Sequence, residues 1–263
     1  MVFHHPAPTA GGASFVLLAD DPDVDRLADA LRSELADVEV LDTDAEGAPL
    51  EAPLLTGRLG MDTVLVAPVA SPVPDGEALA ACHPVWWEDP TPVAGHRAQA
   101  IVVVRSEEDP DEDPRAHALR HAMATSVAVA ALLATDDAVG VYVGPAGATF
   151  PPAEYRDHLA AARTGQQLPV DLWVTTWLEP HEDGTVSGWT HGLTSFGHAD
   201  VVVEDSRRAP SDVYVLLTSL AAHVVTTGDR LEPGHSLDWD DGVHPVEAAP
   251  DSSDAHPLLA IAF

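Results

Sequence analysis

The sequence predicts an α+β protein, in which helices pack on a mixed, largely antiparallel sheet. The main observation is a threefold succession of strand, acidic loop and capped helix, within residues 15–35, 100–134 and 201–227. In addition, short apolar segments that are typical of strands lie between these three regions, so the chain has more strands than helices. We expect two ferredoxin-like halves that share one continuous sheet.

Four helices are expected, near residues 22–35, 114–134, 152–164 and 211–227. The first is predicted by Asp21-Pro22, which supplies an N-cap and a proline at the first helical position. Its apolar residues recur at helical spacing and would form one buried stripe: Val24, Leu27, Ala28, Leu31 and Leu35. The helix from 114 begins in the same way, at Asp113-Pro114, and its second half is apolar on all sides, which predicts burial on more than one side.

The strands are predicted from short apolar runs rich in β-branched residues. They lie at 15–18, 38–41, 54–58, 63–68, 100–105, 139–143, 170–177, 201–203, 243–247 and 258–263. An acidic, proline-containing segment at 106–114 separates the expected halves, because repulsion between its charges and its prolines disfavour packing. The expected organisation is therefore a flexible N-terminus at 1–13, an N-terminal half at 14–105, this linker, and a C-terminal half at 115–263.

The composition is strongly acidic, with 43 Asp and Glu residues against 12 basic residues and a formal net charge of −31. Such a field repels nucleic acid and anionic membranes, so neither is expected as a partner, and it attracts cations or basic proteins. A highly solvated surface, as in salt-adapted proteins, is the simpler explanation of the charge.

Several classes of chemistry are excluded by missing residue types. All the basic residues are Arg, so there is no lysine for a Schiff base or a phosphate-binding loop. A single cysteine, Cys82, excludes an internal disulfide and Cys-rich zinc sites, and we expect a buried thiol there. The N-terminus shows no cationic leader and no apolar run reaches the ~20 residues that span a bilayer, so a cytoplasmic location is expected.

The segment THGLTSFGHADVVVED, at 190–205, is predicted to be a strand, a tight turn and a second strand. Gly192 and Gly197 flank the turn, where positive φ or a close backbone approach favours glycine. An aromatic ring has no reason to lie in an exposed turn, so we expect Phe196 to fold back onto the core.

The same segment contains the candidate metal ligands, His191, His198 and Asp200. If Leu193 pairs with His198, His191 lies opposite Asp200, and all three candidates share one face of the hairpin. Two imidazoles and a carboxylate could bind zinc or act as an acid–base pair. The alternative is that this face is solvated, or that the histidines cap turn carbonyls.

A second histidine pair, His117 and His121, lies at i, i+4 on the helix predicted from 114, a spacing that can chelate a metal. No third ligand is found on that helix. His117, His121 or His235 could also be brought by the fold to the site of His191, His198 and Asp200.

Several motifs along the chain resemble DUF4261, a family of bacterial proteins without an established activity. PVASPVPDGEAL resembles its Pro-x-Pro segment, and WWEDPTPVAGHRAQAIVVV its Trp, His and apolar strand. THGLTSFGHADVVV resembles its Gly-Leu-x-x-Phe-Gly-x-x-acid motif, with Asp200 where the family more often has Glu. LEPGHSLDW and the Ala-Pro-Asp-Ser at 249–252 resemble its closing segment. The resemblance extends from about 15 to 263 and implies a coherent fold, without implying an activity.

These observations favour a non-enzymatic, acidic binding or regulatory protein, such as an inhibitor or an immunity-type protein with a basic partner. A metal-dependent hydrolase that uses His191, His198 and Asp200 is the alternative, and a purely structural oligomer is a third hypothesis. No cofactor is expected, although a divalent metal is compatible with the histidines.

Overall fold

The computed structural model describes residues 12–43, 46, 48–106, 111–239, 242–250, 252–253 and 257–263. Its contacts divide the chain into two compact units, Ala10–Pro169 and Val170–Phe263. The strand before the acidic segment 106–114 and the helix after it belong to the same unit, so this segment connects neighbouring elements within one unit. Residues 107–110 of the segment lie outside the described residues.

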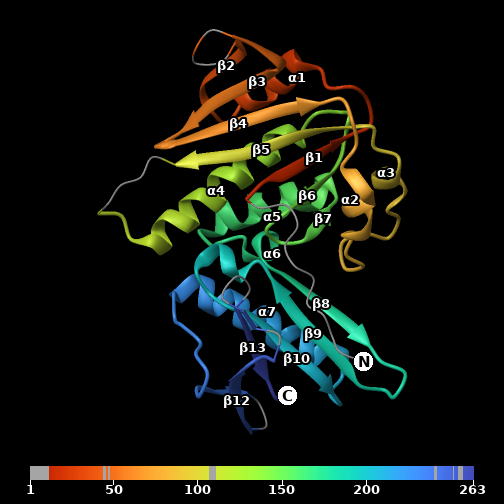
Figure 1. Cartoon of the computed structure of the whole chain (residues 1–263), viewed down its shortest axis with the longest axis vertical. Helices are drawn as coiled ribbons and strands as arrows, with labels where there is room; N and C mark the ends of the chain where they lie inside the picture. Colours follow the sequence, from red (N-terminus) through yellow and green to blue (C-terminus); the bar gives the residue numbers. More distant parts are fainter. Residues whose placement is uncertain are drawn as a thin grey trace. The chain divides into compact units, whose positions relative to one another are not determined.

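The predicted α+β class is confirmed, with largely antiparallel strands and helices packed on them (Figure 1). The expectation of one continuous sheet was wrong, because the described strands form two sheets, one in each unit. The two ferredoxin-like halves are not confirmed.

In the first unit, the described strands form a seven-stranded sheet in the order β2-β3-β4-β5-β1-β6-β7. Every neighbouring pair in it is antiparallel. The strands are β1 (Ser14–Leu18), β2 (Ala36–Thr43), β3 (Pro49–Leu59), β4 (Asp62–Val69), β5 (Ala98–Ser106), β6 (Ala138–Val143) and β7 (Ala148–Phe150). In β4 and β5, Asp62 pairs with Ser106 at one end of the ladder, which brings two polar side chains to the same edge.

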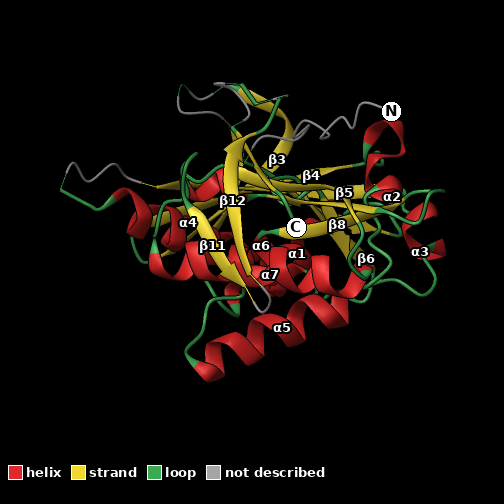
Figure 2. Ribbon diagram, turned by 90° about the horizontal axis from the view of Figure 1, so that it is seen from below, coloured by secondary structure: helices red, strands yellow, loops and turns green. Residues whose placement is uncertain are grey.

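Three helices of this unit, α1 (Val24–Arg32), α4 (Pro114–Leu132) and α5 (Pro152–Gly165), contact the sheet, and α1 and α5 both contact α4. Figure 2 shows α4 and α5 on the same side of the strands. The segment with η1 (Pro74–Gly76), α2 (Glu77–Ala80) and α3 (Thr91–Ala94) packs with β1, β6 and β7. Its apolar residues share a core with Leu17 and Tyr142, whereas the neighbours of these residues along each strand point to the other side of the sheet. The centre of the sheet is therefore covered on both faces.

Burial increases along helix α4 from its first turns to its second half, as its sequence predicted. Asp113 is the N-cap and accepts a hydrogen bond from Ala116 N at 3.3 Å. The second half is buried, with side chains such as Val127, Ala128 and Leu132 in the core. The first two turns are half-buried or exposed, so polar side chains there remain open to solvent.

The second unit contains a six-stranded sheet, counted over the described residues, in the order β11-β12-β13-β10-β9-β8. It is mixed, since β10 and β13 are parallel and the other pairs are antiparallel. Its strands are β8 (Thr175–Pro180), β9 (Val186–His191), β10 (Asp200–Ser206), β11 (Ser236–Trp239), β12 (Gly242–Ala248) and β13 (Leu258–Ile261). Helix α7 (Pro210–Thr227) packs on β8, β9 and β10 and buries one apolar face against them.

Local differences from the prediction have simple causes. The N-cap of α1 is Asp23, whose side chain accepts from Arg26 N at 3.1 Å, and not Asp21. Residues 170–173 were expected to be strand, but they form a short helix, α6 (Val170–Trp173), ahead of β8. Val170, Leu172 and Trp173 are buried there, and α6 contacts α7, so tertiary packing overrides the strand propensity of this run.

Over the described part of the chain, the helices are too short or too polar to span a bilayer.

Candidate functional site

The predicted hairpin at 190–205 is built from β9 and β10, which pair with Trp189 opposite Val202. The connection is a single 3₁₀ turn, η2 (Leu193–Phe196), closed by a hydrogen bond from His198 N to Leu193 O at 3.2 Å. Gly192 and Gly197 have φ angles of 120° and 75°, in the region that favours glycine. The backbone thus has the register and the turn glycines that the sequence suggested.

The carboxylate of Asp200 forms hydrogen bonds within this turn. Its side chain is buried, and its Oδ1 accepts hydrogen bonds from Thr190 Oγ1 at 3.0 Å and from Leu193 N at 3.1 Å. Thr190 Oγ1 in turn accepts from Val201 N at 2.9 Å. The carboxylate therefore satisfies the backbone of the turn, where a buried donor without a partner would be costly.

The two hairpin histidines lie in different environments. His191 is buried at the end of β9, where it pairs with Thr175 of β8, whereas His198 is half-buried after the turn. Over the described residues, no three His, Cys, Asp or Glu side chains lie in an arrangement that could hold a metal ion, and His191, His198 and Asp200 form no such group.

Phe196 folds inward from the turn and is only 7% exposed. Its ring lies 5.5 Å from the ring of Trp173, at an angle of 32° between the two planes. The aromatic residue of the turn is thus part of the core of the second unit.

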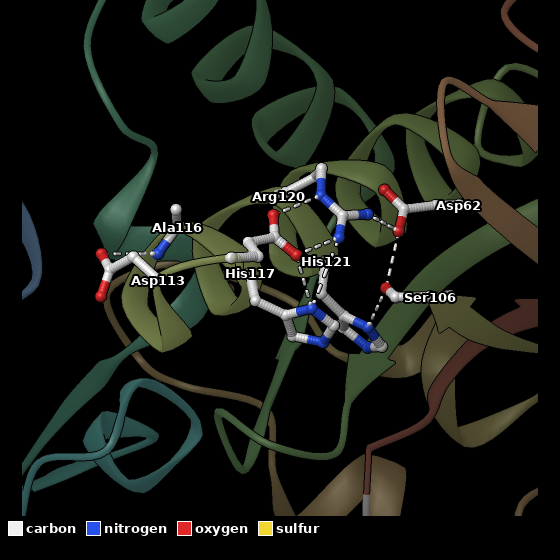
Figure 3. Close-up of polar contacts among 8 residues, drawn as sticks. Asp62, Ser106, Asp113, Ala116, His117, Arg120 and His121 are labelled. Carbon is white, nitrogen blue, oxygen red and sulfur yellow. Dashed lines mark hydrogen bonds and ion pairs between the residues drawn. The ribbon is translucent and has the colours of Figure 1, made fainter. Parts of the chain in front are cut away.

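A different group of polar side chains meets where β4 begins, β5 ends and α4 begins. We call it the α4 polar cluster (Figure 3), and its members are Asp62, Ser106, Glu112, His117, Arg120 and His121. The antiparallel register of β4 and β5 places Asp62 beside Ser106, and helical spacing places the last three on one side of α4.

Arg120 is the centre of this cluster. Its Nη1 donates to Asp62 Oδ1, its Nε donates to Glu112 Oε1 at 3.0 Å, and its Nη2 donates to Glu112 Oε2 at 2.7 Å. The bond with Arg120, together with that from His117, lowers the pKa of Glu112 from 4.5 to about 2. Asp62 is almost fully buried, at 1% exposure, so the guanidinium compensates a carboxylate that would otherwise lack a counter-charge.

The hydrogen bonds also define the protonation of the two imidazoles. Ser106 Oγ donates its only hydrogen to Asp62 Oδ1 at 2.6 Å, so the contact of 3.4 Å between Ser106 Oγ and His121 Nδ1 requires a proton on that nitrogen. His117 Nδ1 lies 3.0 Å from Glu112 Oε2, a carboxylate oxygen that can only accept. In its neutral form, each ring therefore carries hydrogen on Nδ1 and a lone pair on Nε2.

Burial lowers the pKa of His121, with smaller contributions from the charges of His117 and Arg120, although Asp62 opposes the shift. The neutral form of His121 is thereby favoured near neutral pH. Elsewhere, burial raises the pKa of Cys82 to about 11, so its thiol is a poor nucleophile.

The α4 polar cluster contains a serine, a histidine and an aspartate, but their order differs from that of an acyl-transfer triad. Such a triad places histidine between serine and the carboxylate, so that histidine removes the serine proton. Here Ser106 lies between Asp62 and His121 and donates its proton to the carboxylate. This geometry orients an imidazole and does not activate the hydroxyl.

Only part of this cluster was visible in the sequence. The spacing of His117 and His121 identified the histidine pair, and the acidic segment drew attention to residues near Glu112. Asp62 and Ser106 gave no signal, because their proximity depends on the register of β4 and β5 across more than forty residues. The charges and prolines of the segment 106–114 were expected to disfavour packing, but Glu112 is turned toward Arg120 and half-buried.

A family model described as "Domain of unknown function (DUF4261)" matches residues 189–257. The resemblance to DUF4261 is thus confirmed over the part of the second unit that contains the hairpin. The match does not extend over the longer span, from 15 to 263, that the motifs suggested. No curated protein and no solved structure matches the chain.

Proposed function

We propose that this chain is a non-enzymatic binding or regulatory protein of the cytoplasm, of the inhibitor or immunity type, whose partner is a basic protein. The observation that carries the proposal is a series of exposed carboxylates among the described residues between 20 and 51. We call it the acidic edge, and its described members are Asp20, Asp21, Asp23, Asp25, Asp29, Glu34, Asp37, Glu39, Asp42, Glu46 and Glu51.

The acidic edge lies on elements that are neighbours in the first unit. Helix α1 contacts both β2 and β3, and β2 is the outermost strand of its sheet (Figure 1). Arg26 and Arg32 of α1 are engaged in ion pairs, with Asp23 and Asp137 and with Asp29. Asp20 and Glu34 also form ion pairs, with Arg97 and Arg163, so the outer strand β2 is a part of the acidic edge whose carboxylates have no such pair among the described residues.

On β2, the side chains of Asp37, Glu39 and Asp42 are exposed, and no ion pair joins them to another described residue. Carboxylates of this kind contribute little to the stability of the fold, since no cation in the described part of the chain forms an ion pair with them. A basic partner would supply the missing counter-charges and would be steered toward this edge from a distance.

The expected contact is made by side chains and not by addition of a strand. The register of β2 against β3 shifts twice, between Ala36 and Glu39 and again between Leu41 and Thr43. Asp37, at the first shift, has a φ of 52°. Bulges of this kind bend an outer strand and interrupt its row of backbone donors and acceptors, which protects it from pairing with another chain.

The test is a comparison of two charge-matched variants. Asp37→Asn, Glu39→Gln and Asp42→Asn together remove three charges from β2, and Asn is well suited to the φ of residue 37. An arginine-rich peptide serves as the basic probe, and its dissociation constant is measured by fluorescence anisotropy at two salt concentrations. With about 0.5 kcal/mol for each of the three exposed pairs, or about 1.5 kcal/mol together, the variant should bind roughly 10-fold more weakly.

The control removes three exposed or half-exposed charges from the second unit, by Glu179→Gln, Glu182→Gln and Asp183→Asn. It has the same net charge, so we expect less than a twofold change. Equal weakening in both variants would show that the probe senses only the total charge, and the acidic edge would lose its proposed role. Metal-dependent hydrolysis that disappears with His191→Ala or His198→Ala would instead favour the enzyme hypothesis.

A further inference from the structure

We propose that the α4 polar cluster is a binding site for a divalent transition-metal ion that prefers imidazole, with Nε2 of His117 and Nε2 of His121 as the protein ligands. This inference concerns residues outside the acidic edge and the hairpin. It stands or fails independently of the proposed basic partner.

The first argument is the arrangement of the two rings. His117 and His121 are one helical turn apart on α4, and their rings lie beside each other (Figure 3), with centroids 6.4 Å apart and planes inclined by 28°. Histidines at i and i+4 of a helix can chelate one metal ion from the same face.

The second argument is the state of the ring nitrogens. Nδ1 of His117 donates to Glu112, and Nδ1 of His121 donates to Ser106, which is itself bonded to Asp62. Metal-binding histidines characteristically donate their other N–H to a carboxylate or a similar acceptor, which orients the ring and makes the free nitrogen more basic. Both rings of the pair have this support, so the lone pair that a metal needs is already on Nε2.

The third argument is the charge of the surroundings. Two carboxylates, of Asp62 and Glu112, face one guanidinium, of Arg120, so the acidic groups beside the two imidazoles outnumber the guanidinium by one. Arg120 Nη2 lies 3.4 Å from His117 Nδ1 because both donors converge on Glu112 Oε2, so the cation is directed at the carboxylate. The balance favours a bound cation.

The class of metal follows from the donors. Two imidazoles suit Zn²⁺, Cu²⁺ or Ni²⁺, whereas Mg²⁺ and Ca²⁺ prefer carboxylate and carbonyl oxygens. The side chain of His117 is 37% exposed, so water or a ligand from another molecule can reach the ion. Two protein ligands leave coordination positions open, in contrast to the closed shell of a structural zinc site.

The test uses the full chain without a histidine tag, titrated with ZnCl₂ in an excess of Mg²⁺ that occupies carboxylate sites. Long-range ¹H–¹⁵N NMR of the imidazole rings reports the protonated nitrogen before zinc is added and the liganded nitrogen afterwards. We expect Nδ1–H in both rings at first, and then zinc-induced shifts at Nε2 of His117 and His121. Rings protonated on Nε2, or Nε2 signals that zinc leaves unchanged, would overturn the proposal without any variant.

Variants give a second readout, by isothermal titration calorimetry. His117→Asn with His121→Asn should abolish one zinc equivalent, and Ser106→Ala, which removes the acceptor of His121 Nδ1–H, should weaken zinc binding by about 10- to 100-fold. His223→Asn is the matched control, since His223 lies on α7 with a carboxylate partner, Asp229, at 3.1 Å, but has no histidine one turn away. Zinc binding that is unchanged in the double variant, or lost equally in the control, would contradict the assigned site.

Discussion

The hairpin at 190–205 and the α4 polar cluster contain similar side chains, but they use them in opposite ways. In the hairpin, Asp200 is buried and accepts from a hydroxyl and a backbone N–H of its own turn. In the cluster, Asp62 and Glu112 both accept from Arg120. Asp62 also accepts from Ser106, which contacts the imidazole of His121, and Glu112 accepts from the imidazole of His117. The same residue types therefore stabilise a turn in one unit and orient potential ligands in the other.

The hairpin residues are close in sequence, whereas the residues of the α4 polar cluster are distant in sequence and are brought together by the fold. The hairpin was the more conspicuous motif, because its histidines, aspartate and glycines lie within a few positions. The same closeness explains why Asp200 and Thr190 bond within the hairpin, since a tight turn has backbone N–H groups that need acceptors. The cluster, by contrast, joins three elements and leaves two ring nitrogens available.

The largest expected effect is in the hairpin, for Phe196→Ala. Removal of this buried ring should leave a cavity beside Trp173 and lower the free energy of unfolding by about 3 to 5 kcal/mol. Chemical denaturation measures this free energy, and His198→Ala, in the half-buried residue after the turn, is a control that should change stability much less. If the two variants were equally stable, the turn would not be anchored by its aromatic ring.

The next effect is in the cluster, for Arg120→Met. The substitution keeps much of the side-chain volume but leaves the buried carboxylate of Asp62 without its cation, which should cost about 2 kcal/mol. The double variant Arg120→Met with Asp62→Leu should recover part of that loss, because the buried charge is removed as well. A loss that does not depend on the residue at position 62 would mean that the two side chains are not coupled.

A smaller effect is expected for Gly197→Ala in the hairpin. An added Cβ would meet no atom within 4 Å, so any cost comes from the φ of 75° and should be about 1 to 2 kcal/mol. Gly242→Ala provides a comparison, because it is another site where the Cβ meets open space and no positive φ is required. Equal melting temperatures for the two variants would show that the turn tolerates a side chain at 197.

The smallest effect on stability is expected for Glu112→Gln in the cluster. Unlike the effects of the hairpin variants, it should depend on pH. The folded-state pKa of Glu112, about 2, lies below its ordinary value of 4.5. Its contribution to stability is therefore fully present above pH 4.5 and is lost as the pH falls toward 2. The stability difference between wild type and Glu112→Gln should shrink over that range, as measured by denaturation at several pH values, whereas a constant difference would show that the carboxylate is not paired in the folded protein.

Local features of the chain were determined by its sequence. Apolar spacing and the Asp113-Pro114 start predicted the helices, β-branched runs predicted most strands, and the glycines around Phe196 predicted the turn between β9 and β10. These features depend on residues a few positions apart, where backbone sterics and side-chain periodicity act directly. The failure at 170–173 marks the limit of such reasoning, since packing on α7 decides between helix and strand there.

Only the tertiary structure decided which polar groups meet. The separation into two sheets depends on which strands pair, and the pairing of Asp62 with Ser106 depends on the register of β4 and β5. Register and strand order are set by the sum of many contacts between distant residues, to which no single motif corresponds. For the same reason, Glu112 and Arg120 could be recognised as partners of the histidine pair only after β4, β5 and α4 had been placed beside one another.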